Sequence, residues 1–87
     1  MTSGRVLRML REKAGFTQEE VAAVLGVATV SVQNWERSKP MRYPGMISDL
    51  VDIYDASEED RIRLLILMYG GEKDAAYINR LIEGEER

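Results

Sequence analysis

The sequence predicts an all-α protein, a compact bundle of five to six short helices built from 87 residues. Apolar residues recur three and four positions apart along most of the chain, as they do on one face of a helix. Glycines and polar capping residues divide this pattern into short segments, and no pattern typical of a β-strand is present. At this length we expect a single domain, residues 1–87, with one hydrophobic core.

The first helix is expected over residues 4–14, with Ser3 as its N-cap. Its inner stripe comprises Val6, Leu7, Leu10 and Ala14. Gly15 ends the helix because glycine adopts a left-handed conformation at little steric cost, and Phe16 follows as a core residue.

The second helix is expected to begin at Gln18, because Thr17 and Glu20 have the spacing of a capping box. Gly26 ends it, and Val27 then points into the core. The apolar face of this helix comprises Val21, Ala22, Val24 and Leu25.

A third helix is expected from about residue 29 to residue 37, with Val32 and Trp35 on its inner face. The opposite face comprises Thr29, Val30, Gln33 and Asn34. Asparagine and glutamine can pair with adenine through a donor and an acceptor, and valine can pack on a thymine methyl group. These four residues are therefore candidates for reading bases, although a merely polar surface on a helical bundle would look similar.

Three more helices are expected in the second half of the chain. The fourth has Pro44 in its first turn and ends near Tyr54. The fifth begins after the cap Ser57, ends before two glycines, and is followed by a sixth over residues 73–83. The fifth carries two apolar stripes, one of Ile62, Leu65, Ile66 and Tyr69, the other of Leu64, Leu67 and Met68. One stripe should meet the core, and the other should meet the sixth helix or a second subunit.

The segment from the first to the third helix resembles the helix-turn-helix of the Xre/Cro/cI family of transcriptional regulators, including its actinobacterial members. The matching residues are Leu7, Arg8, Arg11, Gly15, Phe16, Thr17, Gln18, Glu19, Val21, Ala22, Leu25, Gly26, Val27, Val32, Trp35, Glu36 and Arg37. The resemblance implies a lambda-repressor-like domain with a family core over residues 1–55 and C-terminal helices over 56–87 that could dimerise. Two positions depart from the family: Ala28 replaces the usual capping Ser or Thr, and Ser38 replaces the usual Gly.

The resemblance also implies roles for particular residues. Arg11 and Glu36 would form an internal salt bridge that fixes the angle of the third helix. Gln18 would donate to a phosphate at the start of the second helix. Apart from the resemblance, Lys39 and Arg42 are the expected ionic contacts to the DNA backbone, because both are charged and lie in the loop beside the third helix.

The charge of the chain is unevenly distributed along the sequence. Residues 1–43 hold seven basic and four acidic side chains, whereas residues 44–87 hold five basic and eleven acidic ones. The overall charge of −3 thus divides into +3 and −6. A protein polarised in this way can present its basic half to phosphate while the acidic half faces away.

We therefore expect a sequence-specific DNA-binding regulator that acts as a homodimer on double-stranded DNA. The sequence has no cysteine and no histidine, which removes thiolate and imidazole chemistry, and no enzyme, metal or cofactor is expected. The absence of cysteine is also consistent with a cytoplasmic protein, and no apolar run is long enough for a membrane span. The alternative is a protein-interaction module on the same fold, antitoxin-like or otherwise binding a protein partner through residues 56–87.

Overall fold

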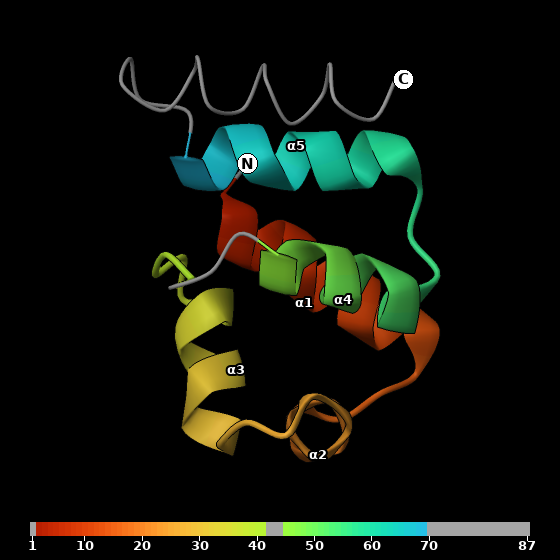
Figure 1. The fold of residues 1–87 in the computed structure, drawn as a ribbon, viewed down its shortest axis with the longest axis vertical. Helices are drawn as coiled ribbons and strands as arrows, with labels where there is room; N and C mark the ends of the chain where they lie inside the picture. Colours follow the sequence, from red (N-terminus) through yellow and green to blue (C-terminus); the bar gives the residue numbers. More distant parts are fainter. Residues whose placement is uncertain (1, 42–44, 70–87) are drawn as a thin grey trace.

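The computed structural model describes residues 2–41 and 45–69, and this part of the chain consists of five helices without strands. The helices are α1 (Ser3–Ala14), α2 (Gln18–Leu25), α3 (Thr29–Glu36), α4 (Gly45–Tyr54) and α5 (Glu58–Tyr69). Within the part of the chain that is described, α2 and α3 lie at one end, α5 lies at the other, and α1 and α4 lie between them (Figure 1). The predicted all-α fold is confirmed, whereas the predicted sixth helix and Pro44 lie outside the described residues. None of the described helices is long and apolar enough to cross a membrane.

The first helix begins one residue earlier than predicted. Thr2, not Ser3, is the N-cap, because the Thr2 hydroxyl accepts a hydrogen bond from the Arg5 amide at 3.3 Å. Ser3 lies inside the helix and is buried. Thr2 and Ser3 are both good capping residues, so the sequence alone did not distinguish them.

Helices α1 to α4 are each followed closely by a residue of positive φ, which comes directly after the helix in three of the four. Gly15 and Gly26 occupy this position after α1 and α2, with φ values of 84° and 71°. Asp55 occupies it after α4, with a φ value of 52°, whereas Ser38, with a φ value of 64°, is the second residue after α3. A side chain in this conformation costs about 1–2 kcal/mol, so the ends of α3 and α4 are more strained than those of α1 and α2.

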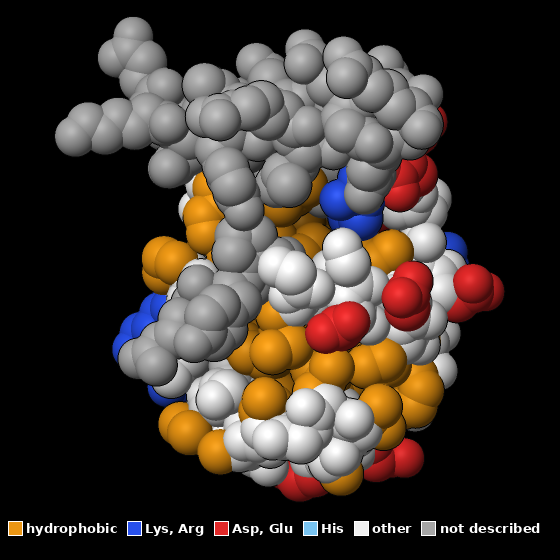
Figure 2. Space-filling view, viewed as in Figure 1, with side chains coloured by type: hydrophobic (Ala, Val, Ile, Leu, Met, Phe, Trp, Pro, Cys, Tyr) orange, Lys and Arg blue, Asp and Glu red, His pale blue; other side chains and the backbone are white. Residues whose placement is uncertain are grey.

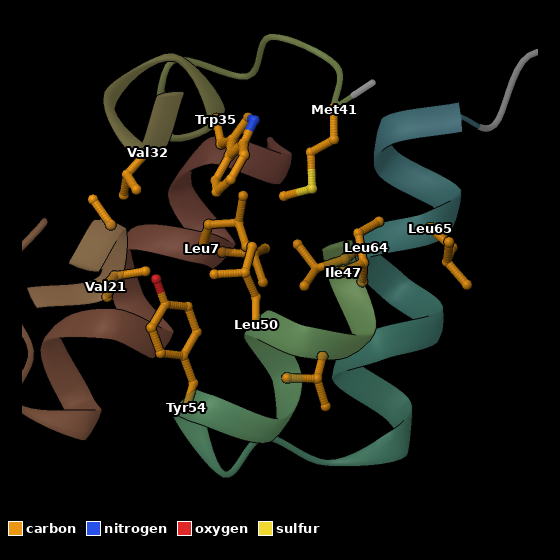
Figure 3. Close-up of a cluster of buried hydrophobic side chains, with 13 residues drawn as sticks. Leu7, Val21, Val32, Trp35, Met41, Ile47, Leu50, Tyr54, Leu64 and Leu65 are labelled. Atoms are coloured by element: carbon orange, nitrogen blue, oxygen red, sulfur yellow. The ribbon is translucent and has the colours of Figure 1, made fainter. Parts of the chain in front are cut away.

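The core lies between α1, α4 and α5 and continues under the α2–α3 unit (Figure 3). Its fully buried side chains are Leu7, Val21, Val32, Ile47, Leu50, Leu64 and Leu65. Two predicted core positions were wrong: Ala14 is exposed, and Val24 is 64% exposed on the outer side of α2. Met41 enters the core from the segment after α3, which the sequence pattern did not indicate.

The predicted division of α5 into two apolar stripes was also wrong. Leu64 and Leu65 belong to different predicted stripes, yet both are fully buried in the core. Ile66 and Leu67 likewise come from different stripes, and they are 52% and 39% exposed. Arg61 takes a buried position on the inward side, which a charged residue rarely does. The apolar surface of α5 that remains exposed is therefore a single strip, which includes Ile66 and Leu67.

Candidate nucleic-acid interface

The α2–turn–α3 unit has the local contacts that the sequence predicted. The Thr17 amide donates to Glu20 Oε1 at 2.9 Å, and the Glu20 amide donates to Thr17 Oγ1 at 3.1 Å, which completes the capping box. After Gly26, the Val27 amide donates back to the Ala22 carbonyl at 3.0 Å. These bonds fix where α2 begins and ends, and so they fix where α3 starts.

The orientation of α3 follows from its two buried residues, Val32 and Trp35, which are 1% and 9% exposed. The opposite side of the helix is open. Val30 is 54% exposed, and Thr29, Gln33 and Asn34 are partly exposed. The four residues predicted to read bases are therefore all accessible from outside the protein.

Glu36, which is the one acidic residue of α3, is turned away from this open face. Arg11 Nε donates to Glu36 Oε2 at 2.6 Å, and Arg11 Nη2 donates to Glu36 Oε1 at 3.0 Å. The two side chains are 13% and 6% exposed, so the pair is largely shielded from water. The hydrogen bond to Glu36 raises the pKa of Arg11 above its ordinary value, which keeps the guanidinium charged. Arg11 Nη1 also donates to the Phe16 carbonyl at 2.9 Å, and this contact ties the end of α1 to the pair.

Gln18 belongs to the same cluster, which the sequence did not indicate. Its Nε2 atom donates to Glu36 Oε1 at 3.2 Å. An amide nitrogen carries two hydrogens, so one donor remains for the phosphate contact expected of this residue. Glu36 thus orients both the third helix and Gln18.

A groove beside the open face of α3 brings together residues of three helices. It is lined by Arg8, Arg11, Thr17, Gln18, Glu19, Gln33, Glu36 and Arg37. Arg37 is exposed, and it was not among the predicted site residues. Its spacing in the sequence could have indicated this role. Arg37 follows Gln33 by four residues and therefore lies on the same side of the helix.

On its other side, α3 is flanked by a second hollow. Ser31, Asn34 and Lys39 line it together with Trp35 and Met41. Lys39 is exposed, and its amide donates to the Asn34 carbonyl at 3.0 Å, so the lysine is held at the end of α3. Ser31 was not predicted as a site residue, and Arg42, which was, lies outside the described residues.

The unusual residue after α3, Ser38, has a compensating contact. Its hydroxyl accepts a hydrogen bond from the Gly4 amide at 3.1 Å, which satisfies a free donor at the start of α1. A Cβ on Gly4 would lie 2.3 Å from the Glu36 carbonyl oxygen, so only glycine permits this approach. At the other end of α3, Ala28 makes no side-chain capping bond, as its identity predicted.

Tyr54 lies under this polar cluster and packs near Phe16, with ring centroids 6.5 Å apart. Its side chain is buried, and burial raises the pKa of Tyr54 to about 12, with the nearby Glu36 carboxylate adding to the shift. The phenol therefore stays neutral at every physiological pH.

Comparisons with known proteins agree with this geometry. The sequence model of a family described as "Helix-turn-helix domain" matches residues 4–64. A protein of Thermococcus kodakarensis named "Putative HTH-type transcriptional regulatory protein" is 35% identical over 63 residues. That match covers 72% of this chain but only 20% of the archaeal protein, so the chain spans about one fifth of that relative. No solved structure matches the chain.

Proposed function

The chain belongs to the helix-turn-helix domain family, and from this premise we propose that it is a transcriptional regulator that binds double-stranded DNA sequence-specifically. In the proposed complex, α3 lies in the major groove, where each base pair presents a distinct pattern of donors and acceptors. The described geometry supports this role through one observation above all. The open face of α3 carries no free carboxylate, because Glu36 is held inside by Arg11 and Gln18.

The chemistry of that face suits base reading. Gln33 and Asn34 each offer a donor and an acceptor, which is what the edge of adenine requires. Val30 adds an exposed apolar side chain that can pack on a thymine methyl group. Thr29 lies in the first turn of the same helix, where a short hydroxyl side chain can approach a base or phosphate.

Contacts to the DNA backbone would come from the two sides of α3. Gln18 would use its remaining N–H together with the free amides at the start of α2. Arg37 lies on that side, and Lys39 lies on the other, with Arg42 following in the chain. Contacts of this kind fix the register of the protein on DNA, whereas the base contacts provide specificity.

We further assign the protein to the Xre/Cro/cI type, on the motif residues between Leu7 and Arg37. In this proposal, residues 1–55 form the family core and residues 56–87 support a homodimer. The exposed strip on α5 that includes Ile66 and Leu67 favours the dimer, since apolar surface gains free energy when covered. Two copies would read two half-sites spaced by about one turn of DNA, about 34 Å.

The same exposed strip also supports the alternative function, a protein-interaction module that binds a protein partner through residues 56–87. The two functions differ in their dependence on salt. Binding to DNA weakens steeply as salt rises, because phosphate contacts release counterions. A complex that depends on the apolar strip of α5 would persist, because burial of apolar surface does not weaken with added salt.

The direct experiment is selection of bound sites from a random duplex DNA pool. We expect an enriched palindromic consensus, since a symmetric dimer reads two equivalent half-sites. Lys39→Ala should reduce the slope of log affinity against log salt by about 0.9. A pool that stays featureless after repeated rounds would contradict the proposed function.

A further inference from the structure

A second surface, formed by α2 and α4, is distinct from the one around α3. It is a groove of about 330 Å³ lined by Val24, Leu25, Asp49, Asp52 and Ile53. Val24 is 64% exposed on the outer side of α2, and Leu25 and Ile53 are partly exposed. Figure 2 shows hydrophobic side chains gathered on this face of the molecule, with acidic side chains beside them. The groove shares no lining residue with either hollow beside α3.

The charged residues that line this groove are both acidic. Asp49 and Asp52 are three residues apart on α4, so they project from the same side of the helix, and both are exposed. No basic residue lines the groove, and among the described residues neither aspartate forms an ion pair. The groove therefore offers two unpaired carboxylates that could bind a cation, next to exposed aliphatic side chains that could make apolar contacts.

We propose that this groove docks a segment of a protein partner that carries lysine or arginine next to aliphatic side chains. The aliphatic side chains would cover Val24, Leu25 and Ile53, and the cations would pair with Asp49 and Asp52. Complementary charge of this kind selects partners and orients them during approach. This proposal goes beyond DNA binding, since it assigns a protein partner to residues that the DNA interface does not use.

Two other occupants fit the surface less well. DNA would bring phosphates against two carboxylates, which repel them. A second copy of this chain would meet the groove symmetrically, with the same patch on both subunits. In such a contact the aspartates of each copy would face a patch that has no basic residue to pair with them. A basic partner avoids both conflicts.

The test uses the full chain and a synthetic amphipathic peptide of leucine and lysine, with a leucine–glutamate peptide as the reference probe. We expect the lysine peptide to shift NMR signals of Val24, Leu25 and Ile53, and the glutamate peptide to leave them unchanged. Asp52→Lys and Val24→Ser should each weaken the lysine peptide about tenfold in fluorescence anisotropy.

Matched controls distinguish the groove from general attraction to an acidic protein. Glu59→Lys makes the same charge change on α5, and Met9→Ser removes an apolar side chain that is 56% exposed on α1. Both should leave peptide affinity within about twofold of the wild type. Equal losses in Asp52→Lys and Glu59→Lys, or no loss in Val24→Ser, would overturn the proposal. A dimer that Val24→Ser dissociates in analytical ultracentrifugation would also overturn it, because the occupant would be a second copy.

Discussion

The two halves of the described bundle differ in the contacts that they make with α1. On one side, α3 packs into the core through Val32 and Trp35 and is also joined to α1 by polar contacts. These are the Arg11–Glu36 pair and the hydrogen bond that Gly4 donates to Ser38, just beyond α3. On the other side, α4 and α5 pack against α1 through aliphatic side chains such as Leu50 and Leu64. Hydrogen bonds are directional, whereas burial of apolar surface is not.

This difference indicates what each half contributes. On the polar side, directional hydrogen bonds add to the packing of Val32 and Trp35 in fixing the angle of α3. A base-reading helix must be placed to within a fraction of an ångström. The aliphatic side contributes to the free energy of folding by burying apolar surface, and it tolerates small shifts. Substitutions on the polar side should therefore change both stability and DNA binding, and substitutions on the aliphatic side should change stability alone.

Arg11→Ala should destabilise the protein most. It leaves the Glu36 carboxylate largely buried without its cation and should lower the free energy of unfolding by about 4 kcal/mol. Urea denaturation measures this loss, and at low temperature the remaining folded protein should bind DNA more weakly because α3 is no longer fixed.

Arg8→Ala is the matched control for that prediction. Arg8 pairs with Glu12 at 3.1 Å, but these side chains are 66% and 57% exposed, so the loss should be below about 0.5 kcal/mol. Similar losses in the two variants would mean that the Arg11–Glu36 pair has no special role in holding α3.

Leu64→Ala tests the aliphatic side. The side chain is fully buried between α5 and the rest of the core, so its truncation should cost about 3 kcal/mol. The folded variant should keep the wild-type DNA preference, as measured by site selection under conditions where circular dichroism shows it folded. A changed consensus would show that the side formed by α4 and α5 also positions α3, and it would contradict this prediction.

The buried phenol of Tyr54 should make the stability of the protein depend on pH in the alkaline range. Burial raises the pKa of Tyr54 to about 12, above its value near 10 in the unfolded chain, so folding favours the protonated phenol. The resulting stability is fully present below pH 10 and is lost as pH rises from 10 to 12, by about 2 kcal/mol. Denaturation curves for the wild type and Tyr54→Phe should show the excess loss only in the wild type. Parallel pH profiles of the two proteins would refute the assignment.

The smallest expected effect is that of Ala28→Ser. Ala28 has the extended backbone of an N-cap, with φ −72° and ψ 147°, but no side-chain oxygen. A serine there should stabilise α3 by about 1 kcal/mol, measured as a higher urea midpoint with an unchanged m-value. Serine at the buried position of Ala22 serves as the contrasting substitution, and it should destabilise the protein.

Much of the α2–α3 unit was predictable from sequence, because its signals are local. The Thr17–Glu20 spacing and Gly26 determine the ends of α2, and each depends only on neighbouring residues. The same holds for Ser57, whose hydroxyl accepts from the Asp60 amide at 3.1 Å at the start of α5. The Arg11–Glu36 contact spans 25 positions and was anticipated only through resemblance to a family.

The features that sequence reasoning missed depend on the packing of distant segments. The apolar residue Val24 points outward because the burial of α2 is already provided by Val21 and Ala22. Met41 is buried because the segment after α3 returns over the core, and its carbonyl accepts a hydrogen bond from the Tyr69 hydroxyl at 2.9 Å. The spacing of apolar residues within a single helix does not predict contacts between distant segments.

The proposed base reading by the open face of α3 can be tested with Asn34→Ala. Binding of the wild type, Asn34→Ala and the control Met9→Ala should be measured against the selected site and its single-base-pair variants. We expect Asn34→Ala to lose about 1–3 kcal/mol of discrimination at one base pair per half-site, and Met9→Ala to match the wild type. Unchanged affinity and unchanged sequence preference in Asn34→Ala would contradict the assignment of this face.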